Sequence, residues 1–238
     1  LLILLIFPGS LSAWHFRYGT MSWKTTDTAR EIELNAQIGW TANHNAFRSS
    51  DDYGDFVSGY VGSIKGGVGD STSGEDYYYE IEWGDSSTTG KMDHKIISRE
   101  GGDRGSDCNS AQCTKSTLSE MGVYDTSATP NWKPGMKHTY SSDGDYVVYW
   151  SSSSRATVEN SNGADWRNET KVNIGGAYAG NNSPVGAVPY VVQVQDNTTF
   201  RYQVSALDPD GDTLGYRWGT KAEFFNGSGD FVMPTGMT

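Results

Sequence analysis

The sequence predicts an all-β protein, and three observations support this. Glycine is abundant, with 29 residues, and the 238-residue chain holds 14 Tyr, 8 Trp and 8 Phe. This mixture of turn formers and aromatic residues is typical of many short strands joined by loops. No stretch of about twelve residues carries apolar residues at the helical period. The clearest strand pattern, EIELNAQIGWTA, alternates apolar and polar positions, and its apolar face holds Ile32, Leu34, Ala36, Ile38 and Trp40.

Further strands are expected on both sides of this one. The segment WHFRYGTMSW places Phe16 and Tyr18 on one face of a strand and Gly19 and Met21 on the other. YYYEIEWGDSS predicts a strand followed by a turn, and HKIIS, DYVVYW and KVNIGGAY predict three more strands. Residues 99–145 are rich in polar residues and are expected to be mostly loop.

The composition changes at GNNSPVGAVP, which predicts a boundary between two β domains. The last segment then carries three or four expected strands, whereas an Ig-like sandwich needs about seven. We therefore expect an apolar N-terminal segment, a β-sandwich, a linker and a partial second β domain. Their predicted ranges are residues 1–13, 14–180, 181–189 and 190–238.

Charge and motif content exclude several function classes. The chain has 18 Lys and Arg against 29 Asp and Glu, whereas nucleic acids and anionic membranes attract basic surfaces. HExxH, GxSxG and a Cys–His pair are all absent from the sequence. We therefore expect no enzyme, although an acidic β protein always offers carboxylate pairs of the kind that hydrolyse glycosides. His138 is expected to be a packing residue rather than a base.

Two cysteines and four sequons predict covalent features of a secreted protein. Cys108 and Cys113 are close in sequence, which favours a local disulfide over free thiols in an oxidising compartment. Such a short loop gains only about 2 kcal/mol from the bond. N-linked glycans are expected at the four N-x-S/T sequons, provided that the source is eukaryotic. The acceptor residues are Asn168, Asn181, Asn197 and Asn226.

Two separated motifs together resemble the PKD type of Ig-like domain. That family pairs an aromatic-Gly-Asp-Gly turn with a later His-Thr-Tyr, a Gly and a Tyr-x-Val. The matching residues within 77–150 are Trp83, Gly84, Asp85, His138, Thr139, Tyr140, Gly144, Tyr146 and Val148. Ser86 departs from the pattern, because the family usually has Gly there, and the gap of about 50 residues between the halves is long. The resemblance implies an antiparallel Ig-like/PKD-like β-sandwich.

The segment SALDPDGDTLGYRW resembles the Asp-Pro-Asp-Gly-Asp loop of cadherin-like repeats on microbial surface proteins. In such proteins these repeats are building modules and seldom catalytic. The resemblance implies that the partial C-terminal domain is Ig-like or cadherin-like and lies at the cell surface.

The acidic loop also predicts a calcium site. Asp208, Asp210 and Asp212 stand at alternate positions around Gly211, and carboxylates that converge in this way repel one another without a cation. Ca²⁺ takes six to eight oxygen ligands, so it would need backbone carbonyls or a further acid such as Glu223. The alternative is a solvated acidic turn.

The opening stretch LLILLIFPGSLSA allows two interpretations. It has the apolar core and small-residue end of a secretory signal peptide, and it is too short to span a membrane. It also predicts an apolar strand of about 23 Å, whose buried face would contribute on the order of 6–10 kcal/mol. The residues of this strand are Leu1, Leu2, Ile3, Leu4, Leu5, Ile6 and Phe7.

These features together predict a structural subunit of an extracellular fibre. The apolar strand of one copy would complete the partial C-terminal domain of the next, and head-to-tail addition gives a filament. The partner is then a second copy of the chain, with no insertion into a membrane. The alternative is a secreted adhesin or carbohydrate-binding module, monomeric after signal cleavage, with glycans as partners. Trp132 and the aromatic residues of YYYEIEW are its candidate sugar platforms.

Overall fold

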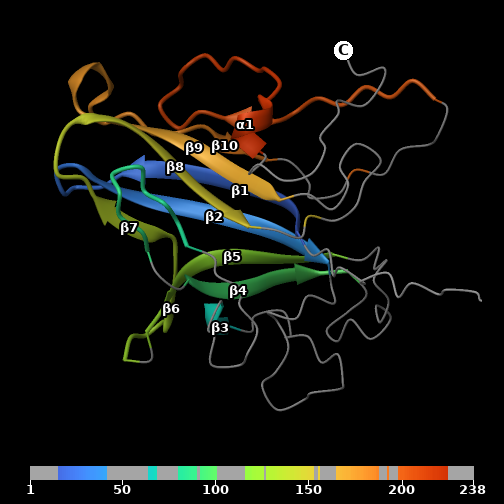
Figure 1. Ribbon diagram of the computed structural model, residues 1–238, viewed down its shortest axis with the longest axis horizontal. Helices are drawn as coiled ribbons and strands as arrows, with labels where there is room; N and C mark the ends of the chain where they lie inside the picture. The colour runs from blue at the N-terminus through green and yellow to red at the C-terminus, as the bar shows by residue number, and fades with distance from the viewer. Residues whose placement is uncertain are drawn as a thin grey trace, which may run out of the picture.

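The computed structural model consists mainly of antiparallel β-sheets, which confirms the all-β prediction (Figure 1). It describes residues 16–41, 64–68, 80–89, 92–100, 116–125, 127–152, 155, 165–187, 192 and 198–224. The first strands are β1 (Phe16–Thr25), β2 (Glu31–Thr41), β3 (Ile64–Val68), β4 (Met92–Arg99), β5 (Ser116–Tyr124), β6 (Trp132–Pro134) and β7 (Met136–Thr139). The later elements are β8 (Gly144–Ser152), β9 (Trp166–Ile174), the 3-10 turn η3 (Gly176–Tyr178), β10 (Val185–Gly186), β11 (Ala206–Leu207) and the helical turn α1 (Lys221–Phe224).

The larger sheet has the order β1-β2-β5-β4-β3, with β7 also paired to β2 and β6 to β5. The expected alternation in β2 is confirmed, because all five apolar positions of its inner face are buried. Each of these side chains is at most 3% exposed. β2 therefore contributes a continuous row of apolar side chains to the core.

In residues 99–145, which are expected to be mostly loop, the described part contains the strands β5, β6 and β7, while residues 101–115 and 126 lie outside it. β5 lies in the middle of the larger sheet, where it pairs with β2 on one side and β4 on the other. Three of its buried positions hold Ser116, Thr117 and Ser119, and Met121 is its one large buried apolar residue. The hydroxyl of Ser119 accepts a hydrogen bond from the Trp40 indole at 3.0 Å. Small polar side chains fit here because large rings from neighbouring strands fill the space.

A smaller sheet covers β1 and β2. It contains β8 and β9, and the turn at residues 80–89 joins the free edge of β8. Glu82 and Tyr149 exchange two backbone hydrogen bonds of 2.8 and 3.0 Å across this junction. The two sheets enclose the core in a sandwich-like arrangement.

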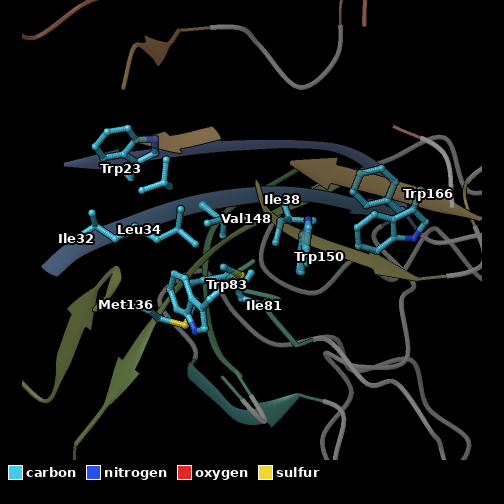
Figure 2. Close-up of a cluster of buried hydrophobic side chains, with 14 of the residues drawn as sticks. Trp23, Ile32, Leu34, Ile38, Ile81, Trp83, Met136, Val148, Trp150 and Trp166 are labelled. Carbon is cyan, nitrogen blue, oxygen red and sulfur yellow. The ribbon is translucent and has the colours of Figure 1, made fainter. Parts of the chain in front are cut away.

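Tryptophan rings fill the centre of this core. Figure 2 shows Trp150 and Trp166 from the smaller sheet beside Ile38 of β2. The Trp150 and Trp166 rings meet edge to face at 5.0 Å, and the Phe16 ring stacks on Trp166 at 3.8 Å. Aromatic pairs of this kind contribute beyond their buried area.

The faces of β1 differ from the simple alternation that the sequence predicts. Phe16 and Met21 were expected on opposite faces, yet both pack against the core. The pairing of β1 with β2 is irregular between Phe16 and Tyr18. Because a bulge inserts an extra residue, the faces exchange across it.

Candidate functional site

The structure brings together the two halves of the PKD-like motif. The turn at residues 80–89 supplies Trp83 and Asp85, β7 supplies His138, and the Tyr146 ring comes from β8. The rings of Trp83 and His138 stack in parallel with centroids 4.6 Å apart. The rings of Tyr140 and Tyr146 stack at 4.0 Å beside them. Residues about 50 positions apart in sequence therefore form one cluster.

A contact between a histidine and a carboxylate crosses this cluster. His138 Nε2 lies 2.8 Å from Asp85 Oδ2, and both side chains are less than one-fifth exposed. The backbone N–H and the hydroxyl of Ser87 both donate to Asp85 Oδ1. Burial raises the pKa of Asp85, but the hydrogen bonds from Ser87 and His138 outweigh it, so the pKa lies below its ordinary value.

Tyr140 closes the cluster from the other side. Its hydroxyl donates to the Trp83 carbonyl at 3.2 Å. Burial, and then the nearby Asp85 carboxylate, raise the pKa of this hydroxyl. The Asp85 carboxylate accepts hydrogen bonds from Ser87 and contacts His138. Together with the bond from Tyr140 to the Trp83 carbonyl, these contacts fix the turn against β7 and β8. This is the geometry of a packing cluster, which is the role expected for His138.

Backbone conformation explains one match of the motif and its one departure. Gly84 has φ +81°, and a Cβ there would lie 2.7 Å from the Val147 carbonyl oxygen. Only glycine fits that position without a shift of β8. Ser86, the departure from the family pattern, has φ +74°, where glycine is also favoured.

The acidic loop binds groups of the protein itself. Asp208 is 9% exposed, and its Oδ1 accepts the backbone N–H of Asp210 at 2.9 Å and of Asp212 at 3.1 Å. Gly211 closes the loop with φ +84°. Both carboxylate oxygens of Asp210 accept hydrogen bonds from Asn182. Within the described ranges, no group of three or more His, Cys, Asp or Glu side chains is placed to hold a metal ion. The calcium site stays a prediction.

Exposed apolar side chains are concentrated in the last part of the described chain. Eight of the twelve exposed large hydrophobic residues in the described part lie between positions 185 and 218. We call them the C-terminal apolar surface: Val185, Val192, Phe200, Tyr202, Val204, Leu207, Tyr216 and Trp218. Their exposed fractions range from 40% at Val192 to 72% at Leu207. The alternation of Phe200, Tyr202 and Val204 is the sequence signal for this surface.

Two predicted glycosylation sites and one predicted sugar platform lie at partly or fully buried positions. Asn168 lies in β9, its Nδ2 atom is buried, and a Cβ on Gly19 would lie 2.5 Å from it. A glycan on Asn168 would therefore require the contact between β9 and β1 to open. Asn181 is half-buried, and its Nδ2 donates to the Asn182 carbonyl at 3.3 Å. The sugar-platform candidate Trp132 is only 7% exposed.

Several predicted residues lie outside the described part of the chain. They are Leu1 to Phe7, Cys108, Cys113, Asn197 and Asn226. The described segments include no helix with the length and apolar character needed to cross a membrane. No protein-family model matches the chain, and comparisons with characterised proteins and with solved structures also find no match.

Proposed function

We propose that the protein is an extracellular structural subunit that assembles with copies of itself through the C-terminal apolar surface. In this proposal an Ig-like/PKD-like sandwich is followed by a partial Ig-like or cadherin-like domain. The carrying observation is the contrast in burial along the chain. Strands β1 to β9 enclose an apolar core, whereas residues 185–218 expose eight large hydrophobic side chains.

The exposed area is large enough to matter for association. Full burial of one such side chain contributes roughly 1.5–3 kcal/mol, and these are about half exposed. Covering all eight would therefore contribute on the order of 6–12 kcal/mol. Association itself costs an estimated 4–15 kcal/mol in lost freedom of motion. The surface alone roughly offsets that cost, so a stable contact needs an additional element.

The additional element that we propose is the apolar strand Leu1 to Phe7 of a neighbouring copy. Its burial would add on the order of 6–10 kcal/mol, enough to make the contact stable. Addition of a strand supplies main-chain hydrogen bonds together with side-chain pockets. Because donor and acceptor lie on different parts of the chain, the contact is head-to-tail and generates a filament.

The predicted disulfide, glycans and calcium site are part of the same proposal. An extracellular location suits a Cys108–Cys113 disulfide and N-linked glycans at the predicted sequons. Calcium at the acidic loop would further stiffen the C-terminal segment. The proposal includes no enzymatic activity.

Sedimentation velocity of the full chain over a range of concentrations tests the proposal. We expect large assemblies for the natural chain and mainly monomer for Val204→Lys, because the charge disrupts an apolar contact. Val123→Lys is the matched control, because both valines are 46% exposed and Val123 lies on β5, outside the surface. A natural chain that stays monomeric at every concentration refutes self-assembly. Equal effects of the two variants refute the assigned surface.

The donor strand needs its own test. Leu4→Asp should weaken assembly as strongly as Val204→Lys if residues 1–7 enter the neighbouring copy. Mass spectrometry of native material establishes whether peptides from residues 1–13 are present. Their absence would identify the segment as an export signal and remove the donor strand from the proposal.

A second function is favoured by the aromatic content of the same surface. Tyr202, Tyr216 and Trp218 are 41%, 61% and 56% exposed, and exposed aromatic rings stack on sugar rings. In this alternative the protein is a monomeric adhesin or carbohydrate-binding module. A glycan array with the natural chain and Trp218→Ala tests it, with Trp132→Ala avoided because that ring is buried.

A further inference from the structure

The outer edge of β1 carries a short partner segment from beyond β9. Ser183 Oγ accepts the Trp23 N–H at 2.7 Å, and the Ser183 N–H donates to the Trp23 carbonyl at 2.9 Å. The Trp23 indole also donates to the Lys171 carbonyl at 2.7 Å. Residues 181–183 are thereby tied to β1, within a stretch that the sequence predicts as a linker.

Asn182 connects this segment to two other parts of the chain at once. Its Oδ1 accepts the Thr25 N–H at 2.8 Å and the Thr25 hydroxyl at 3.3 Å. Its own backbone N–H donates to Asp210 Oδ2 at 2.7 Å, and its Nδ2 donates to Asp210 Oδ1 at 2.9 Å. One amide side chain therefore links β1 to the acidic loop.

The acidic loop is built to present Asp210 to Asn182. Asp208 accepts the backbone N–H groups of Asp210 and Asp212, which holds the loop closed around Gly211. The pairing of β10 with β11 places the loop beside residues 181–187. Asp208 is nearly buried and shapes the loop, whereas Asp210 is exposed and makes the contact.

We propose that Asp210 and Asn182 form a latch that fixes the C-terminal segment to the edge of β1. The latch has two consequences in the folded chain. It holds the acidic loop 208–212 beside β1. It also covers the backbone N–H of Thr25, and the neighbouring Ser183 covers the backbone groups of Trp23, which would otherwise be exposed on an edge strand. The inference concerns the joint itself and holds whether or not copies assemble.

Amide hydrogen exchange on the dilute, monomeric full chain tests the latch. Asp210→Asn keeps the shape of the side chain but removes one acceptor and the charge. We expect exchange at the Asn182 and Thr25 amides to accelerate about 10- to 100-fold, because charge-assisted hydrogen bonds are among the strong ones. Asp212→Asn is the matched control, since it removes the same charge from the same loop and should leave both amides slow.

Two further readouts make the result decisive. Slow exchange at Leu34 in β2 shows that a variant has kept the folded sandwich. Asn182→Ala should give the same acceleration at Thr25 as Asp210→Asn, and small-angle scattering should show a longer particle for both. Equal exchange at Asn182 and Thr25 in Asp210→Asn and Asp212→Asn would overturn the latch. Because no assembly is measured, this failure is distinct from failure of the proposed function.

Discussion

His94 predicts a loss of stability in mild acid. The side chain is completely buried in β4, with Ser119 Oγ 3.2 Å from Nδ1 and the rings of Trp40 and Trp150 around it. Burial lowers the pKa of His94 from 6.5 to about 3. The folded protein therefore keeps this ring neutral in conditions where the unfolded chain binds a proton.

The sign and size of the effect follow from linkage. Above pH 6.5 neither state is protonated at His94, so its contribution to stability is fully present. As the pH falls toward 3, the unfolded state gains the proton first, and each unit costs about 1.4 kcal/mol. Between neutral pH and about pH 5 the free energy of unfolding should fall by about 2 kcal/mol.

Urea unfolding at pH 7 and pH 5 measures this difference. His94→Gln removes the titrating group, so its loss of stability between the two pH values should be about 2 kcal/mol smaller than that of the natural chain. Because both chains share all other titratable groups, the difference between their pH dependences gives the contribution of His94. His138→Gln, at a partly exposed site, should keep the dependence due to His94. The same pH dependence in the natural chain and His94→Gln would refute the assignment.

Three further predictions concern turns and loops. Ser86→Gly should stabilise the protein by about 0.5–1 kcal/mol in thermal or urea unfolding, because Ser86 has a positive φ; no gain would contradict the strained turn. Gly84→Ala should destabilise it by more than about 1 kcal/mol through φ and a clash with the Val147 backbone, whereas Gly215→Ala, in open space, should change little. Calcium titration by calorimetry should show binding at the loop 208–212 that Asp212→Asn weakens; an unchanged thermal midpoint with and without calcium would remove the calcium site.

Sequence reasoning was most reliable where apolar and polar residues alternate cleanly. β2 shows this, because its five inward positions are all apolar and all buried. β5 shows why the pattern fails elsewhere. Its buried positions carry Ser and Thr beside a single large apolar residue, Met121, and the rings of Trp40 and His94 from the neighbouring strands lie against Ser119. A strand whose buried positions are mostly small and polar gives only a weak apolar–polar alternation in the sequence.

The geometry of the site was only partly accessible from sequence. The motif predicted a relation between Trp83 and His138, but a stack with the Asp85 carboxylate at its edge depends on the pairing of β7 and β8 with distant segments. The contact between Asn182 and Asp210 was missed altogether. Its residues lie 28 positions apart in polar sequence, and their types are equally common in solvated turns.

The described tryptophans divide into two optical populations. The described indoles of the sandwich, including Trp40, Trp150 and Trp166, are buried, whereas Trp218 on the C-terminal apolar surface is 56% exposed. Buried indoles emit at shorter wavelengths and are shielded from quenchers, so among the described indoles the long-wavelength emission and its quenching by acrylamide should report Trp218. Coverage of the surface by a neighbouring chain or a sugar would then be visible as a blue shift without any added dye. Near-UV circular dichroism of the crowded core would show at the same time whether the sandwich stays intact.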